Sequence, residues 1–128
     1  MAEFNHTIVW CRDKQRSAAF LTDILGLPPA RPFFHFLVVD LKNGASLDFY
    51  QKKGTVSPQH YAFLVSDEEF DAGFAKLKDR GLAYWADPAR TQSGQINHHF
   101  GGRGVYFADP DEHLLEMITR PYGPENQL

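Results

Sequence analysis

Two histidines and two carboxylates stand at matched places in a repeated pattern, and such side chains are among those that bind metal ions. The segment that begins at His6 reappears at His60, 54 positions further on (60 − 6 = 54). Asp48 and Glu116 each lie in an apolar stretch at the end of a copy, 68 positions apart (116 − 48 = 68). Because duplication puts equivalent residues at equivalent places, we expect both imidazoles and one or two carboxylates to converge on one centre. Such a donor set suits divalent metals and leaves coordination positions open for substrate.

His6, His60 and Glu116 are the expected metal ligands. Glu116 shares a strand face with apolar neighbours such as Leu114, and a carboxylate among apolar residues needs a partner. Taken alone, either histidine would fit a core histidine bonded to the backbone, but their matched placement favours a shared site. Asp48 remains open between a fourth ligand, a base beside the metal, and a carboxylate one methylene too short to reach it.

The elements that must hold these residues form two modules with the same order. In the first module, Asp13 is a good N-cap, Gly26 stands where the helix should stop, and Asn43-Gly44 is a strong hairpin signal. The segment 4–11 is apolar on both faces, which predicts a strand covered on both sides. The predicted elements are, in order, a strand over 4–11, a helix, a short strand, and strands over 33–41 and 45–51.

The second module repeats this order with a longer loop. Ser66 and Glu69 form a capping box at the start of its helix. Residues 87–102 are rich in Pro, Ser, Gly, Asn and His, and this loop explains why the offset grows from 54 to 68. Loops of this length inside a compact domain are usually functional or disordered. The predicted elements are, in order, a strand over 59–65, a helix ended by Gly81, a short strand over 82–86, and strands over 103–108 and 113–119.

Size and composition set limits on the function. The chain has 128 residues and a net charge of −3 with both signs interspersed, so it lacks the basic stripe typical of nucleic-acid binding. Its apolar stretches are too short to span a membrane, and it shows no secretory signal. The single Cys11 fits a reducing cytoplasm. We therefore expect one cytoplasmic domain over residues 1–128, with modules at 4–52 and 58–120 and a frayed tail after Arg120.

The paired modules, the histidine at the start of each, and the ending Tyr106-Phe107-Ala108-Asp109-Pro110-Asp111…Leu115-Glu116 carry a family resemblance. Over residues 4–120 the chain resembles the vicinal oxygen chelate superfamily, which includes glyoxalase I, fosfomycin-resistance thiol transferases, extradiol dioxygenases and bleomycin-binding proteins. The resemblance implies an α+β fold in which two βαβββ modules form an eight-stranded half-open barrel. It also implies one divalent metal ion per site, Fe, Mn, Zn or Ni, that chelates two neighbouring substrate oxygens. Glu112 stands where the family commonly has Gly, which puts the φ angle of that turn in question.

The extradiol dioxygenases share the set of two histidines and one glutamate, and they carry a tyrosine ten residues before the glutamate, where this chain has Tyr106. They also carry a histidine about nine residues before that tyrosine. Here that position is Asn97, which His98 and His99 follow. The resemblance implies Tyr106 as a hydrogen-bond donor and His98 or His99 as an acid/base group beside the metal. The alternative is that Tyr106 only packs and that both histidines are solvated loop residues.

Other branches of the family resemble the chain differently. Glyoxalase I has a Glu where this chain has Asp48. The fosfomycin enzymes add cationic groups for a phosphonate, and Arg103 or Arg120 could fill that role, although a surface position is the commoner fate of an arginine. Phe34 and Phe36 lie in an aromatic segment that could line the cup of the barrel, and we expect them to contact the substrate.

We therefore expect a metal-dependent enzyme that acts on a small molecule with two adjacent oxygens, with extradiol-type dioxygenation of a catechol-like compound as the lead chemistry. A glyoxalase I-like lyase or a fosfomycin-type thiol transferase is the second hypothesis. The third is a non-catalytic protein that binds a drug or metabolite in the aromatic cup. Relatives of this length often pair their modules across two chains, which implies a homodimer with two sites. His113 has the opposite strand parity to Glu116 and is excluded as a ligand.

Overall fold

The computed structural model of the chain describes residues 1–121 and separates into two compact units. The first unit covers Met1–Ser57 and the second begins at Pro58. The predicted modules 4–52 and 58–120 therefore fall one within each unit. That the two units make up a single domain stays a prediction.

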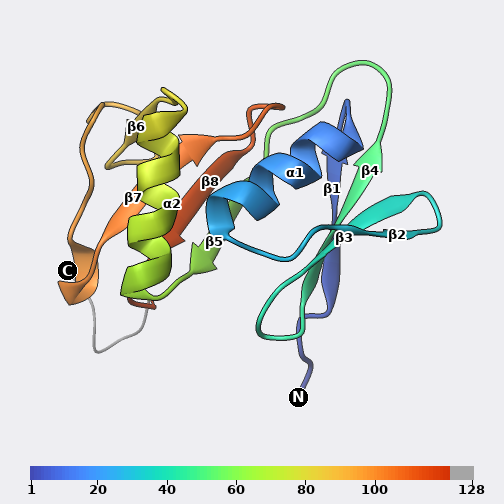
Figure 1. Cartoon of the computed structure of the whole chain (residues 1–128), viewed down its shortest axis with the longest axis horizontal. Helices are drawn as coiled ribbons and strands as arrows, with labels where there is room; N and C mark the ends of the chain where they lie inside the picture. Colours follow the sequence, from blue (N-terminus) through green and yellow to red (C-terminus); the bar gives the residue numbers. More distant parts are fainter. Residues whose placement is uncertain (122–128) are drawn as a thin grey trace. The chain divides into compact units, whose positions relative to one another are not determined.

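Both units have the same order of elements, and Figure 1 shows one helix lying across one face of the sheet in each. The first unit contains β1 (His6–Cys11), α1 (Lys14–Leu25), β2 (Arg31–Phe33), β3 (Phe36–Asp40) and β4 (Ser46–Gln51). The second contains β5 (His60–Leu64), α2 (Asp67–Asp79), β6 (Tyr84–Trp85), the 3-10 turn η1 (His99–Gly101), β7 (Gly104–Ala108) and β8 (Leu114–Ile118). Each sheet has four strands, in the orders β1-β4-β3-β2 and β5-β8-β7-β6. The predicted α+β fold of two βαβββ modules is confirmed.

The strand register shows the duplication residue by residue. β1 runs parallel to β4 with His6 opposite Ser46, and β5 runs parallel to β8 with His60 opposite Leu114. The offsets between these pairs are 54 on the first strand (60 − 6) and 68 on the last (114 − 46), as the sequence repeat predicts. Each sheet therefore carries its histidine and its carboxylate on adjacent parallel strands.

The predicted helix starts are confirmed because the capping side chains make their bonds. Asp13 accepts a hydrogen bond from the Arg16 N–H at 3.1 Å at the start of α1. At the start of α2, Ser66 and Glu69 bond reciprocally, with Glu69 N–H donating to Ser66 Oγ at 3.1 Å and Ser66 N–H donating to Glu69 Oε1 at 2.8 Å. Gly26 ends α1 with φ +64°, which suits a residue without a Cβ.

In each unit the sheet face under the helix forms the core. The buried side chains of this layer include, in the first unit, Val9, Cys11, Ile24, Val39, Leu47 and Phe49, and in the second, Phe63, Phe70, Leu77, Val105, Phe107 and Met117. Burying one large apolar side chain fully contributes about 1.5–3 kcal/mol, so these layers stabilise the packing of the helix on the sheet in each unit.

The prediction of a first strand covered on both sides is wrong. Along β1, Val9 and Cys11 on the helix side are buried, whereas Trp10, on the face that carries His6, is 41% exposed. The same holds for β5, where Leu64, on the face that carries His60, is 61% exposed. Each sheet has a helix on one face only, so both histidines stand on the open face.

The predicted strand over residues 33–41 is also wrong in part, because a tight turn divides it. β2 ends at Phe33 and β3 begins at Phe36, and Phe34 in the turn has φ +52°. Aromatic residues favour strands, which is why the sequence suggests a continuous one. A left-handed φ at a residue with a Cβ costs roughly 1–2 kcal/mol, and the β2–β3 pairing holds this turn in place.

The turn between β7 and β8 answers the question raised by Glu112. Asp109 Oδ1 accepts from the Asp111 and His113 N–H groups, both at 2.9 Å. Glu112 then takes φ +67°, the left-handed region that glycine adopts without strain. This turn therefore has the backbone geometry that favours glycine, with Glu112 at that position.

Two further expectations concern the ends of the chain and membranes. Within residues 1–121, none of the helices combines the length and the apolar character that crossing a bilayer demands. The predicted frayed tail lies, from residue 122 on, outside the described residues.

Candidate metal centre

His60 and Glu116 meet on the open face of the second sheet. They come from the adjacent parallel strands β5 and β8, and His60 Nε2 lies 3.2 Å from Glu116 Oε1. The Glu116 side chain is only 3% exposed, whereas that of His60 is 48% exposed. The pair therefore joins a buried carboxylate to an imidazole that solvent can reach.

The second ring nitrogen of His60 shows which form the imidazole takes. His60 Nδ1 lies 2.9 Å from the carbonyl oxygen of Leu114, which can only accept, so Nδ1 carries the proton. In the neutral ring Nε2 is then a lone pair, and it faces a carboxylate oxygen. Two acceptors at this distance need a metal cation or a proton between them, and the proton can come from the carboxyl group. A ring held at Nδ1 and offering Nε2 beside a carboxylate is the usual arrangement of a metal-binding histidine, so the donor set fits a divalent metal.

In the first unit His6 is held through the same ring nitrogen but by a different acceptor. His6 Nδ1 lies 2.6 Å from the side-chain oxygen of Asn5, on the exposed part of the chain. Its Nε2 is therefore also the nitrogen available for a metal. Both histidines present the same atom on the open face of their own sheet.

Asp48 occupies the place in the first sheet that Glu116 occupies in the second. Asp48 lies opposite Val38 on β3, and Glu116 lies opposite Tyr106 on β7. Asp48 is 8% exposed and accepts a hydrogen bond from Ser46 Oγ at 2.9 Å. The Asp48 carboxylate is therefore bonded to the Ser46 hydroxyl, whereas the Glu116 carboxylate contacts the His60 ring nitrogen.

The three expected ligands divide between the units. His6 belongs to the first unit, and His60 and Glu116 belong to the second. Across the described residues 1–121, no three or more His, Cys, Asp or Glu side chains gather in a group that could hold a metal ion. The second unit therefore brings together two of the three expected ligands, and their role as ligands, like that of His6, stays a prediction.

Tyr106 lies beside the His60–Glu116 pair. It is directly opposite Glu116 across β7 and β8, is 7% exposed, and its ring centroid lies 6.0 Å from that of His60. This is the face on which a hydrogen-bond donor to a bound substrate would have to stand. The catalytic role expected for Tyr106 stays a prediction.

The loop over residues 87–102 brings a buried Asn97 to the position where extradiol enzymes have histidine. Asn97 is 9% exposed, its side-chain Nδ2 donates to the Ala86 carbonyl at 2.9 Å, and its backbone exchanges two hydrogen bonds with Gly104. His98 and His99 follow on the exposed surface. The burial of Asn97 could not be predicted from the sequence, because a position in a loop does not reveal which side chain is buried.

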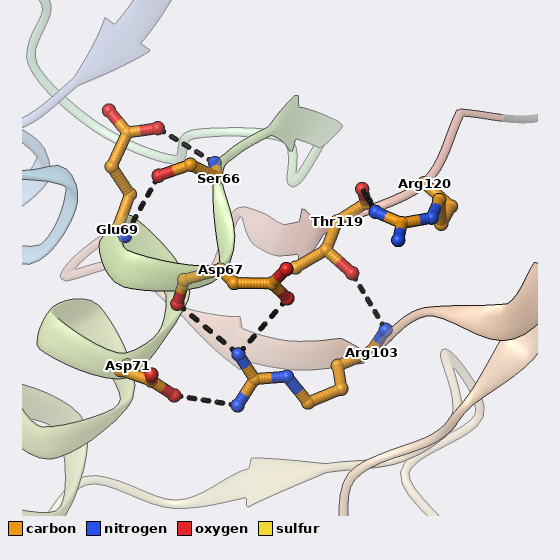
Figure 2. Close-up of polar contacts among 7 residues, drawn as sticks. All are labelled: Ser66, Asp67, Glu69, Asp71, Arg103, Thr119 and Arg120. Carbon is orange, nitrogen blue, oxygen red and sulfur yellow. Dashed lines mark hydrogen bonds and ion pairs between the residues drawn. The ribbon is translucent and has the colours of Figure 1, made fainter.

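Arg103 points toward α2, and Figure 2 shows its guanidinium beside Asp67 and Asp71. Its guanidinium donates to Asp71 Oδ1 at 2.6 Å and to Asp67 Oδ1 at 3.3 Å, and it lies 4.5 Å from the ring centroid of Phe70. The Asp71 hydrogen bond raises the pKa of Arg103. These contacts favour a structural role. Arg120 is exposed and donates to the Thr119 carbonyl at 3.1 Å.

The first sheet carries a row of aromatic side chains on the face that holds His6. Phe36 lies opposite Tyr50, with ring centroids 5.1 Å apart, and Tyr50 stacks on Trp10 at 5.0 Å. Phe34 is at the tip of the β2–β3 turn and is 84% exposed. Trp10 and Tyr50 are absent from the expected substrate contacts, although Trp10 shares the strand parity of His6 and could have been found by that signal.

Comparison with known proteins identifies the family. The Glyoxalase/Bleomycin resistance protein/Dioxygenase superfamily matches residues 3–117. The chain belongs to this superfamily. The solved structure of Oxidase ChaP-H1 has a TM-score of 0.94 and 55% identity to it, covering 96% of this chain and 99% of the other.

Two relatives of this superfamily member are named as transferases. Glutathione transferase FosA of Serratia marcescens is 27% identical, over 91% of this chain and 80% of that protein. Metallothiol transferase FosB of Shouchella clausii (strain KSM-K16) is 33% identical over 56% of this chain, and the match spans only 45% of FosB. The superfamily match therefore includes relatives with different chemistries.

Proposed function

We propose that the chain is a metal-dependent oxidase of the vicinal oxygen chelate type, acting on a small molecule with two adjacent oxygens. Extradiol-type dioxygenation of a catechol-like compound is the lead chemistry. The observation that carries the proposal is the contact of His60 Nε2 with buried Glu116, with Tyr106 opposite on the same face. The 55% identity to Oxidase ChaP-H1 over nearly the whole of both chains supports an oxidation.

His60 and Glu116 would hold one divalent metal ion, and His6 of the same chain or of a second copy would complete the set. When bound, the metal would polarise both substrate oxygens, and Fe(II) or Mn(II) would also support oxygen chemistry, whereas Zn(II) or Ni(II) would supply Lewis acidity alone. Leu114 keeps the proton on His60 Nδ1, so that Nε2 stays a ligand atom. The name of the metallothiol transferase relative agrees with a metal site.

The remaining residues would position the substrate and its protons. The Tyr106 hydroxyl would donate to a substrate oxygen, since its ring lies beside His60 on the open face. His98 or His99 would take up the proton that the diol loses. Both follow Asn97, whose side chain anchors this loop by a hydrogen bond to the Ala86 carbonyl. Phe36, with Tyr50 and Trp10 beside it, would offer an apolar surface to an aromatic ring.

Oxygen uptake by the Fe(II)-loaded protein, kept reduced, tests the proposal. Across a panel of catechol-like compounds we expect uptake by the wild type and a loss of about 100-fold or more in Glu116→Gln. The amide keeps the shape of Glu116 and can donate to His60 Nε2, so the variant should fold as the wild type does, as checked by thermal unfolding. No uptake on any compound would overturn the dioxygenase proposal. Tight ligand binding that survives chelation would then favour a sequestering protein.

Thiol transfer, or a related lyase reaction, is the second candidate. The identities to FosA and FosB favour it, and so does buried Asp48 at the counterpart position of Glu116. Asp48→Ala separates the cases. A large loss of activity is expected if Asp48 serves the lyase or thiol-transfer reaction, and a small one if the enzyme is a dioxygenase. Asp48→Asn, which can still accept from Ser46 Oγ, is the matched control for folding.

A further inference from the structure

We propose that His113 is the positioning residue for the His60 imidazole, and through it for the metal centre. The effect on the metal rests on the proposed function, whereas the positioning of the His60 imidazole does not. His113 lies just before β8, is 0% exposed, and shares no face with Glu116. It is therefore a buried histidine that the metal centre does not use as a ligand.

The His113 ring holds the backbone at the start of β5. Its Nδ1 lies 2.9 Å from the Gln59 nitrogen, and because the backbone N–H donates, Nδ1 is the acceptor. The ring packs against Tyr61 in a T-shaped arrangement, with centroids 5.6 Å apart and planes at 80°. The imidazole is thus fixed both by a hydrogen bond and by packing.

The backbone of His113 is fixed as well. Its N–H donates to Asp109 Oδ1 at 2.9 Å, and its carbonyl accepts from the Asp109 N–H at 3.0 Å. A ring on an anchored backbone can set the position of its partner, which here is Gln59.

Gln59 and His113 directly precede His60 and Leu114 in the chain, and these two residues bond through the His60 ring. The Leu114 N–H donates to the Gln59 carbonyl at 2.8 Å, and the Leu114 carbonyl accepts from His60 Nδ1 at 2.9 Å. The His113–Gln59 bond therefore closes the strand pair one residue before His60. Without it, the start of β5 can shift against β8, and the Leu114 carbonyl no longer holds the His60 ring in one tautomer.

The first unit shows that the fold itself does not require this bond. By the repeat offsets, Ala45 takes the place of His113 (113 − 68 = 45) and Asn5 takes that of Gln59 (59 − 54 = 5). The corresponding ladder bond, from Ser46 N–H to the Asn5 carbonyl, is present at 3.0 Å without any ring to support it. A parallel strand pair of this type thus forms without the histidine. The His113 ring is present in the unit in which the histidine, His60, contacts the buried Glu116 carboxylate.

The test compares His113→Leu with His113→Asn, whose side-chain oxygen can take the place of Nδ1 as acceptor. Val105→Ala, which opens a cavity in the same sheet away from the pair, is the control for a general loss of stability. Long-range proton–nitrogen NMR reports the tautomer of His60 in metal-free protein, and titration with Co²⁺ alone reports the affinity of the site. Should His113→Leu fail to fold, it is replaced by His113→Gln, whose amide is one methylene further from Cα than that of Asn and so is displaced from the position of Nδ1.

We expect the wild type, His113→Asn and Val105→Ala to keep a single Nδ1-protonated His60 and similar Co²⁺ affinity. His113→Leu should populate both tautomers and bind Co²⁺ about tenfold or more weakly, the range found for partners of metal-binding histidines. An unchanged tautomer in His113→Leu, or the same change in Val105→Ala, would overturn the inference while leaving a metal site standing. No Co²⁺ binding in any protein, with the tautomer change still seen, would support the positioning role and sink the metal.

Discussion

The chemistry of single residues depends on which ring nitrogen each histidine has engaged. His6 and His60 both use Nδ1, one with the Asn5 side chain and the other with the Leu114 carbonyl. Sequence could predict that His60 and Glu116 share a face, because both the repeat and the strand parity point to it. It could not predict the acceptor of His60, because Leu114 lies 54 positions away and meets His60 only through the register of β5 and β8.

Glu112 keeps a left-handed φ of +67° in a turn that favours glycine. Glu112→Gly should raise the free energy of unfolding by about 0.5–1 kcal/mol, because relief of the strain exceeds the added entropy of the unfolded chain. The carboxylate lies 3.6 Å from Arg90 in an exposed ion pair, which contributes little. Urea unfolding measures the change. Glu112→Ala, which loses the ion pair but keeps the Cβ, should show no gain, and an equal gain there would point to the charge.

Burial raises the pKa of the Asp109 carboxyl above its ordinary 3.8, and nearby His113 opposes this. A raised folded-state pKa means that the contribution of this group to stability is present below the ordinary value and is lost as pH rises through the folded one. Asp109→Asn cannot ionise but keeps an acceptor for the Asp111 and His113 N–H groups. We expect urea unfolding from about pH 4 upward to show a flatter pH dependence in the variant. A steeper decline in the variant would contradict the sign.

At the level of elements, the sequence is most informative where a side chain ends or begins a helix. Asp13, Ser66 and Glu69 act locally, so their bonds can be predicted from neighbouring residues alone. The divided strand at Phe34 could not be predicted, because its aromatic residues favour a strand by propensity while pairing between β2 and β3 imposes the turn. The open sheet face beside Trp10 was missed for a similar reason, since an apolar pattern does not reveal on which side a helix lies.

Arg103 joins β7 to the first turn of α2 through Asp67 and Asp71. Arg103→Met should lower the free energy of unfolding by about 1 kcal/mol and leave the KM for substrate unchanged, because the side chain contacts α2. Arg120→Met is the matched control, since it removes a cation from the exposed end of the same sheet. A higher KM in Arg103→Met with unchanged stability would instead support the phosphonate or carboxylate clamp expected from the sequence.

At the scale of the molecule, the repeat distributes the expected ligands over two units. A homodimer with two sites remains our expectation, and the ligands of one site could come from a single chain or be shared between both chains. Monomers at micromolar concentration in the ultracentrifuge would rule out the shared arrangement. Mixing His6→Ala with Glu116→Gln protein tests it further. In mixed dimers one of the two sites is intact if chains share ligands, so about a quarter of the wild-type metal content should return. If each site lies within one chain, none returns.

The contact between His60 and Glu116 joins residues 56 positions apart. A ribosome must therefore release the last strand before the two side chains can meet, and the chain must close a long loop before they do. While only β5 and α2 have been synthesised, His60 is present without Glu116, so the two donors cannot bind a metal ion together. A metal ion would therefore bind after β5 has paired with β8. Metal binding would follow the assembly of the second sheet and would not nucleate it.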